Sequence, residues 1–162
     1  MCIRDRSSIP TASYDVVVIG SGPGGYVAAI RAAQLGLKTA IVEKDAKVPG
    51  VGLGGTCLHR GCIPTKAMLK SATLFDEVRH AADFGVKVAG VELDFDAVRK
   101  FRDKVVVKGA RGVEYLMKKN RVDVVPGFGR LDGPGRVRVA VAVPEGERVL
   151  EAKSILLATG SA

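Results

Sequence analysis

The sequence has no tryptophan, and only 5% of its 162 residues are aromatic, although 25 are lysine or arginine. A surface that binds nucleic acid usually combines clustered basic residues with aromatic side chains on which bases stack. We therefore interpret the formal charge of +8 as a solvated basic surface and expect no nucleic-acid partner. Because no run of eighteen apolar residues occurs, no membrane span is predicted.

Cysteine is scarce as well, with three residues in all. Three cysteines do not make the disulfide framework of a small secreted protein. Cys2 belongs to residues 1–13, which lack apolar periodicity and are predicted to be a disordered leader or an artefact, with a short import sequence as the less favoured alternative. Cys57 and Cys62 remain as a local pair, which in a cytosol-like protein is more often catalytic, redox-active or metal-binding than structural.

Residues 14–43 follow the order of a βαβ unit. Apolar runs at 14–19 and 38–42 predict buried parallel strands, and the alanine-rich segment 26–35 predicts a helix between them. Later patterns predict helices at 67–82 and 96–119 and strands at 122–125, 137–142, 148–152 and 154–160. The expected fold class is α/β, a Rossmann-like parallel sheet with helices and a small antiparallel β insertion.

A GxGxxG motif, formed by Gly20, Gly22 and Gly25, lies between the first strand and the first helix. In this context its glycines give a tight turn, let the backbone approach a pyrophosphate and pack the helix on the strand. Glu43 ends the second strand, where a carboxylate can accept hydrogen bonds from a ribose. These parts in this order indicate a dinucleotide site rather than a glycine-rich surface turn, and they do not separate NAD from FAD.

The cysteine pair lies in residues 54–66, GGTCLHRGCIPTK. In a regular helix, residues five apart have Cα atoms about 8 to 9 Å apart, whereas disulfides rarely span more than about 7 Å. The pair can close only where the helix is distorted, and Gly61 and Pro64 permit such a break. Two alternatives stay open, a pair of buried small hydrophobic residues and half of a metal site, but the second lacks a further Cys/His pair.

Residues 54–66 closely resemble the redox signature of the pyridine nucleotide-disulfide oxidoreductases, and their Cys-Ile-Pro-x-Lys ending is most similar to members that oxidise dihydrolipoamide. With Gly-Phe-Gly at 127–129 and the terminal Ala-Thr-Gly, the resemblance covers nearly all of 14–162. It implies that Cys57 exchanges with a dithiol substrate, that Cys62 faces the flavin of FAD, and that Lys66 favours the thiolate and reduced flavin. It implies further cofactor contacts for Gly20, Gly22, Pro23, Gly24, Gly25, Glu43, Lys44, Gly55, Thr56, Gly127, Gly129, Ala158, Thr159 and Gly160.

The resemblance also implies a larger enzyme. Residues 14–162 would be the amino-terminal FAD-binding domain, about the first third of a homodimeric protein, with the NAD and dimerisation domains absent from this sequence. FAD would be the cofactor and NAD+ the co-substrate, without a metal. The partner would be the lipoyl-bearing acyltransferase of 2-oxo acid dehydrogenase complexes, and the location cytoplasmic.

The family's catalytic base is a histidine near the carboxyl end, supplied by the partner subunit. His59 and His80 are instead interpreted as surface or packing residues, so the chain by itself is expected to show no turnover. It is also expected to fold poorly, because its sheet would lack a later strand of the FAD domain and its interface partner. Two alternatives remain, another disulfide reductase, such as one for mercuric ion or glutathione, and an FAD-binding module without redox chemistry.

Overall fold

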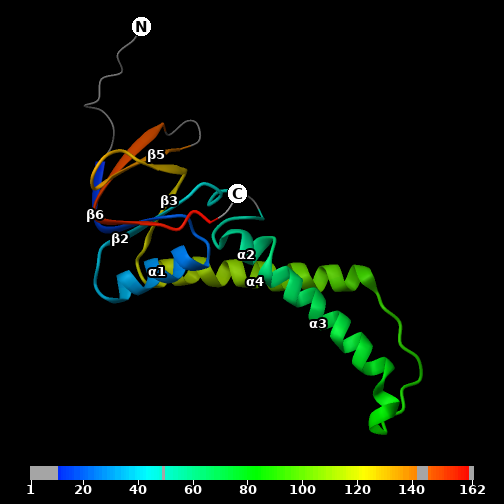
Figure 1. The fold of residues 1–162 in the computed structure, drawn as a ribbon. Helices are drawn as coiled ribbons and strands as arrows, with labels where there is room; N and C mark the ends of the chain where they lie inside the picture. The colour runs from blue at the N-terminus through cyan, green and yellow to red at the C-terminus, as the bar shows by residue number, and fades with distance from the viewer. Residues whose placement is uncertain (1–10, 49, 142–145, 161–162) are drawn as a thin grey trace.

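A computed structural model describes residues 11–48, 50–141 and 146–160. Its centre is a six-stranded sheet in the order β3-β2-β1-β6-β5-β4 (Figure 1). The strands are β1 (Thr11–Ile19), β2 (Thr39–Glu43), β3 (Asp123–Pro126), β4 (Phe128–Leu131), β5 (Arg136–Ala140) and β6 (Glu147–Leu157). Strands β3, β2, β1 and β6 run parallel, and β5 and β4 continue the sheet in antiparallel fashion. The predicted fold class is confirmed.

The helices are α1 (Pro23–Gln34), α2 (Gly55–His59), α3 (Cys62–Arg79) and α4 (Phe95–Lys119), with a short 3-10 helix, η2 (Ala81–Phe84), after α3. Asp94 caps α4 by accepting a hydrogen bond from the N–H of Ala97 at 2.9 Å. Gly109 and Gly112 lie within α4 without interrupting it. A Cβ at Gly109 would lie 2.7 Å from the Leu58 side chain, so this glycine lets α2 pack closely on α4.

Each face of the sheet has its own core, because successive strand residues point to opposite faces. Val18 and Ile41 face the helices and are buried with Ala29 of α1, Leu58 of α2 and Met117 of α4. On the opposite face, residues of β1, β2 and β6 pack with residues of the antiparallel strand β5. This second core contains Val17, Ile19, Ala40, Val42, Val137, Val139 and Leu150. Burial on both faces explains why β1 and β2 are continuous apolar runs.

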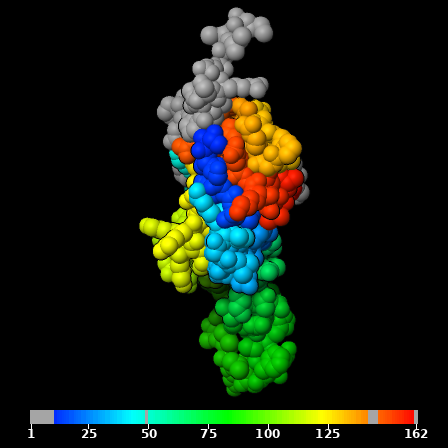
Figure 2. All heavy atoms as spheres, turned by 90° about the vertical axis from the view of Figure 1, so that its left-hand side faces the viewer, coloured from blue at the N-terminus to red at the C-terminus, as the bar shows by residue number. Residues whose placement is uncertain are grey.

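Helix α3 and the amino-terminal part of α4 project away from the sheet (Figures 1 and 2), whereas the carboxyl-terminal part of α4 packs on it through Val113 and Met117. On α3, Leu69 and Leu74 are 58% and 54% exposed, whereas Ala67 is buried. Phe84, in η2 at the tip, is 83% exposed. Among the described helices, none has both the length and the apolar character needed to cross a bilayer.

Several strand bounds differ from those predicted. β1 begins at Thr11 rather than at residue 14, because residues 11–13 pair with 149–151 of β6. The two strands predicted at 148–152 and 154–160 are one strand, β6, which ends at Leu157. Residue 142 of a predicted strand and residues 1–10 of the predicted leader lie outside the described residues.

Helix starts also fall earlier than predicted. Helix α1 begins at Pro23 rather than at residue 26, so Gly24 and Gly25 lie in its first turn. Proline suits this place, since its fixed φ is helical and its missing N–H would have no intrahelical acceptor. Helix α3 begins at Cys62 rather than at residue 67.

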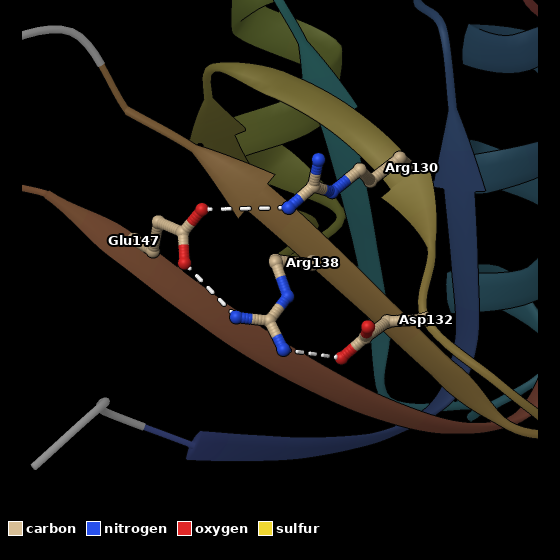
Figure 3. A network of polar contacts seen from close by, with 4 residues as sticks. All are labelled: Arg130, Asp132, Arg138 and Glu147. Carbon is tan, nitrogen blue, oxygen red and sulfur yellow. Dashed lines mark hydrogen bonds and ion pairs between the residues drawn. The ribbon is translucent and has the colours of Figure 1, made fainter. Parts of the chain in front are cut away.

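A network of charges ties β4, β5 and β6 together (Figure 3). The guanidinium of Arg138 donates to Asp132 Oδ2 at 2.8 Å and to Glu147 Oε2 at 2.9 Å. Arg130 lies 3.6 Å from Glu147 Oε1. Glu147 therefore bridges two arginines that face each other across the β4–β5 pair, and Asp132 pairs with one of them, Arg138. The hydrogen bond from Arg138 holds the pKa of Asp132 below its ordinary value of 3.8.

This network predicts an acid-sensitive contribution to stability. Because the folded pKa of Asp132 is lowered, its carboxylate stabilises the fold fully above the unfolded pKa, and this contribution is lost as the pH falls through the folded pKa. We expect Asp132→Asn to lower the thermal unfolding midpoint at pH 7 and to change it much less well below pH 3.8. Asp96→Asn, which breaks an exposed pair with Arg99 on α4, is the control and should have little effect. An equal effect of Asp132→Asn at both pH values would contradict the assignment.

Candidate active site

The carboxyl ends of β1, β2 and β6 border a cavity of about 420 Å³. Ligands of open α/β sheets bind at this edge. The cavity brings together eleven of the predicted site residues: Gly20, Gly22, Pro23, Glu43, Lys44, Gly55, Thr56, Cys57, Ala158, Thr159 and Gly160. Six others are absent from its lining: Gly24, Gly25, Cys62, Lys66, Gly127 and Gly129.

Two glycines of the motif are required by the protein's own packing. A Cβ at Gly25 would lie 1.9 Å from the carbonyl oxygen of Gly20, and a Cβ at Gly20 would lie 2.3 Å from that of Ala158. Both obstacles are backbone atoms, which cannot move aside as a side chain can. The helix α1 and the segment after β6 can therefore approach the turn only because these positions lack a side chain.

Gly22 differs from both. A Cβ there would meet no protein atom within 4 Å, and its φ of −64° is open to any residue. Neither packing nor backbone conformation thus requires a glycine at this position, which lines the cavity at the start of α1. The first N–H groups of a helix lack intrahelical acceptors and attract anions. The space beside Gly22, which any side chain at this position would fill, lies at a helix N-terminus. It therefore suits the close approach of a pyrophosphate.

Glu43 is buried at the end of β2, with 8% exposure. Its Oε2 accepts hydrogen bonds from the N–H of Ser21 at 2.9 Å and from the Ser21 hydroxyl at 2.7 Å. Its Oε1 accepts one from the N–H of Asp45 at 3.0 Å. A carboxylate has about four acceptor sites, so Glu43 is held in place while capacity for a ribose hydroxyl remains.

The redox segment consists of two helices rather than one distorted helix. Helix α2 ends at His59, Gly61 has the non-helical angles φ −120° and ψ −103°, and α3 starts at Cys62. This break brings the Cα atoms of Cys57 and Cys62 to 4.7 Å, and the two sulfurs form a disulfide. The distance lies within the range that disulfides span, so the predicted break at the cysteine pair is confirmed.

The two cysteines differ in position. Cys57 is half-buried and lines the cavity, whereas Cys62 is exposed and does not. Lys66 is exposed one turn beyond Cys62 on α3, also outside the lining. The assignment of Cys57 to substrate exchange and of Cys62 and Lys66 to the flavin stays a prediction.

At positions 127 and 129, contacts within the protein itself favour glycine. Gly127 has φ +141°, its N–H donates to the Glu43 carbonyl at 2.9 Å, and a Cβ there would lie 2.5 Å from the Ala140 oxygen. A Cβ at Gly129 would lie 3.0 Å from the side chain of Val42. These contacts within the protein explain both glycines, and the predicted contact of Gly127 and Gly129 with the cofactor stays a prediction.

Sequence reasoning missed six residues that line the cavity: Ser21, Asp45, Val51, Gly52, His59 and Arg60. His59 is half-buried, and its Nε2 donates to the carbonyl of Leu53 at 2.8 Å, so it braces the loop before α2. His80, by contrast, is on the surface at the end of α3. Ser21 gave no signal in the sequence, because it occupies a variable position of the glycine motif and its contact with Glu43 is made across the site.

A cavity of the dinucleotide-binding type, with one cysteine of a disulfide in its wall, is the arrangement expected of a disulfide oxidoreductase. The family described as pyridine nucleotide-disulphide oxidoreductase matches residues 14–162. The chain therefore belongs to this family, and the resemblance seen in its cysteine motif is confirmed.

Curated relatives agree with this assignment. The chain is 51% identical over 155 residues to a dihydrolipoyl dehydrogenase of Bacillus subtilis, covering 91% of this chain and 31% of the relative. It is 50% identical to a mitochondrial dihydrolipoyl dehydrogenase of Pisum sativum, covering 91% and 28%, and 47% identical to a leghemoglobin reductase of Vigna unguiculata, covering 91% and 27%. The chain thus spans less than a third of the length of each of these three relatives.

Proposed function

We propose that the complete polypeptide carrying this chain is an FAD-dependent enzyme that oxidises protein-bound dihydrolipoamide and reduces NAD+, with the Cys57–Cys62 disulfide as electron acceptor. The observation that carries this proposal is the disulfide beside the cavity that the glycine turn and Glu43 form. Support comes from the similarity to dihydrolipoyl dehydrogenases. Bound FAD would supply a two-electron carrier between the dithiol and NAD+.

The residues of this chain divide the work between binding and exchange. The turn at Gly20 and Gly22 with the start of α1 would bind the pyrophosphate, and Glu43 the ribose. Of the other predicted contacts, those in the cavity wall are Pro23, Lys44, Gly55, Thr56, Ala158, Thr159 and Gly160. Contacts from Gly24, Gly25, Gly127 and Gly129 are proposed as well, through backbone atoms.

In the exchange step, one sulfur of dihydrolipoamide, as a thiolate, attacks Cys57 and forms a mixed disulfide while Cys62 leaves as a thiolate. The second lipoyl sulfur then attacks the first, closing the lipoyl disulfide and releasing Cys57. The substrate has lost two electrons and two protons, and the Cys57–Cys62 disulfide has become a dithiol. Lys66, one turn beyond Cys62, would favour the thiolate form by its charge.

For the complete polypeptide we also propose a homodimer, a cytoplasmic location and, as its partner, the lipoyl-bearing acyltransferase of a 2-oxo acid dehydrogenase complex. The basis is the similarity to dihydrolipoyl dehydrogenases, which include bacterial and mitochondrial proteins.

Anaerobic titration of the oxidised complete polypeptide with dihydrolipoamide tests the proposal. We expect one FAD per chain and uptake of four electrons, two by the disulfide and two by the flavin, followed by reoxidation with NAD+. Flavin absorbance and labelling of the released thiols are the measurements. Reduction by a reduced nicotinamide nucleotide but not by dihydrolipoamide, followed by reoxidation with mercuric ion or glutathione disulfide, would assign the chain to another disulfide reductase. If the protein binds FAD but contains no reducible disulfide, it is an FAD-binding module without redox chemistry.

A further inference from the structure

Ser21 occupies a variable position of the GxGxxG pattern, where the motif itself requires no hydroxyl. It is nevertheless fully buried, with 0% exposure, between the end of β1 and the start of α1. A buried hydroxyl lowers stability unless it forms hydrogen bonds. The bonds that Ser21 makes therefore indicate what it does.

The Ser21 hydroxyl bridges two parts of the site. It donates to Glu43 Oε2 at 2.7 Å, and its oxygen accepts a hydrogen bond from the N–H of Gly54 at 3.2 Å. The same N–H also lies 3.1 Å from the Ser21 carbonyl oxygen. The Ser21 side chain thus contacts Glu43, the residue predicted to bind the ribose, at the end of β2. It also contacts Gly54, which precedes α2 and lies 33 positions after Ser21 in the sequence.

These contacts occur where the glycine turn at residues 20–25 meets the cysteine segment at residues 54–66. A Cβ at Gly55 would lie 2.8 Å from the Cα of Gly22, so the two backbones are in contact. Cys57 follows two residues later in α2. The position of Ser21 is therefore fixed from both sides, and its hydroxyl hydrogen is directed at Glu43.

We infer that Ser21 is a positioning residue for the nucleotide, and that it acts by orienting the Glu43 carboxylate; this inference rests on the proposed FAD site. Two of the three hydrogen bonds that the Glu43 carboxylate accepts from described residues come from Ser21. Without the hydroxyl, a buried carboxylate loses one of them and must rotate or take up water. The oxygen that would accept from the ribose then no longer has one fixed direction.

Binding of FAD and of ADP to the apoprotein of the complete polypeptide tests this role. ADP carries the adenosine ribose but no flavin, so an effect transmitted through Glu43 must weaken both ligands alike. We expect Ser21→Ala to raise both dissociation constants about tenfold, as for loss of one hydrogen bond to a buried charged group. In the Glu43→Gln background, Ser21→Ala should add less than about twofold, because the two residues act together.

Thr39→Val is the matched control. Thr39 is another buried hydroxyl, 2% exposed, on β2, where it donates to the Leu37 carbonyl at 3.0 Å and does not line the cavity. It should change the unfolding midpoint without changing either dissociation constant. Should Ser21→Ala not fold, Ser21→Cys replaces the hydroxyl with a weak donor and is expected to act in the same direction.

The outcomes separate this inference from the proposed function. If the parent binds no FAD, the proposed function fails. If the parent binds FAD and Ser21→Ala binds both ligands with parental affinity, the inference alone is overturned. A loss confined to FAD would also overturn it, because the hydroxyl would then act through Gly54 and the redox segment. If Ser21→Ala weakens FAD and ADP binding by the same factor in the Glu43→Gln background as in the parent, the proposed role of Glu43 is contradicted.

Discussion

The Cys57→Ser variant of the complete polypeptide is expected to lose at least about a thousandfold of its dihydrolipoamide-dependent NAD+ reduction and to keep its FAD. A serine oxygen cannot replace sulfur in a disulfide, so the electron pair of the substrate dithiol has no acceptor. The glycine turn and Glu43, which would bind the nucleotide, remain unchanged. Steady-state rates and flavin absorbance measure the two parts of the prediction.

Cys2→Ser is the matched control for this variant. It also exchanges one cysteine for serine, but Cys2 lies outside the described residues and is not a member of the disulfide. We expect it to retain parental rates. Substantial dihydrolipoamide turnover by Cys57→Ser would remove the disulfide from the reaction path and leave the bound flavin to accept electrons directly. That result would exclude the proposed exchange at Cys57.

The parts of the fold that depend on local sequence were predictable. The apolar runs of β1 and β2 and the alanine-rich α1 carry their own signals, and the glycine motif fixes the turn between them. The break between α2 and α3 followed from chain geometry, since two cysteines five residues apart cannot pair across a regular helix. Both features needed no knowledge of distant residues.

Strand pairing was less predictable, because it depends on residues far apart in sequence. The segments 148–152 and 154–160 were predicted as two strands, yet β1 pairs with β6 from Val149 to Leu157 and keeps it continuous. Strand β4 was not predicted, because Phe128 lies between two glycines and no longer apolar run marks the segment. It becomes a strand only by pairing with β5. Local propensity is overridden by neighbours in the sheet.

Site residues that belong to a sequence motif were predicted. Residues that act by holding other residues of the site in place were missed. Glu43 was found because it ends the second strand of a βαβ unit. Ser21 and His59 were missed because their roles depend on contacts with Glu43 and Leu53 across the site. Their hydrogen-bond partners in space are not visible from periodicity or spacing.

Gly25→Ala is expected to prevent formation of the nucleotide site altogether. A Cβ at this position would lie 1.9 Å from the carbonyl oxygen of Gly20, a distance no relaxation of side chains can relieve, so α1 must move away from β1. The burial of Ala29 between the helix and the sheet would be lost with it. We expect FAD to be absent from the purified variant and its yield of folded protein to fall sharply.

Two neighbouring glycines make this prediction specific. A Cβ at Gly24 meets no atom within 4 Å and Gly24 does not line the cavity, so Gly24→Ala should fold and bind FAD. Gly22→Ala should fold equally well, because its Cβ also meets no protein atom, but it should lose FAD affinity if a pyrophosphate lies there. The three variants thus separate helix packing from nucleotide contact in one motif. Parental FAD affinity in Gly22→Ala would mean that the phosphates lie elsewhere, even if Gly25→Ala behaves as expected.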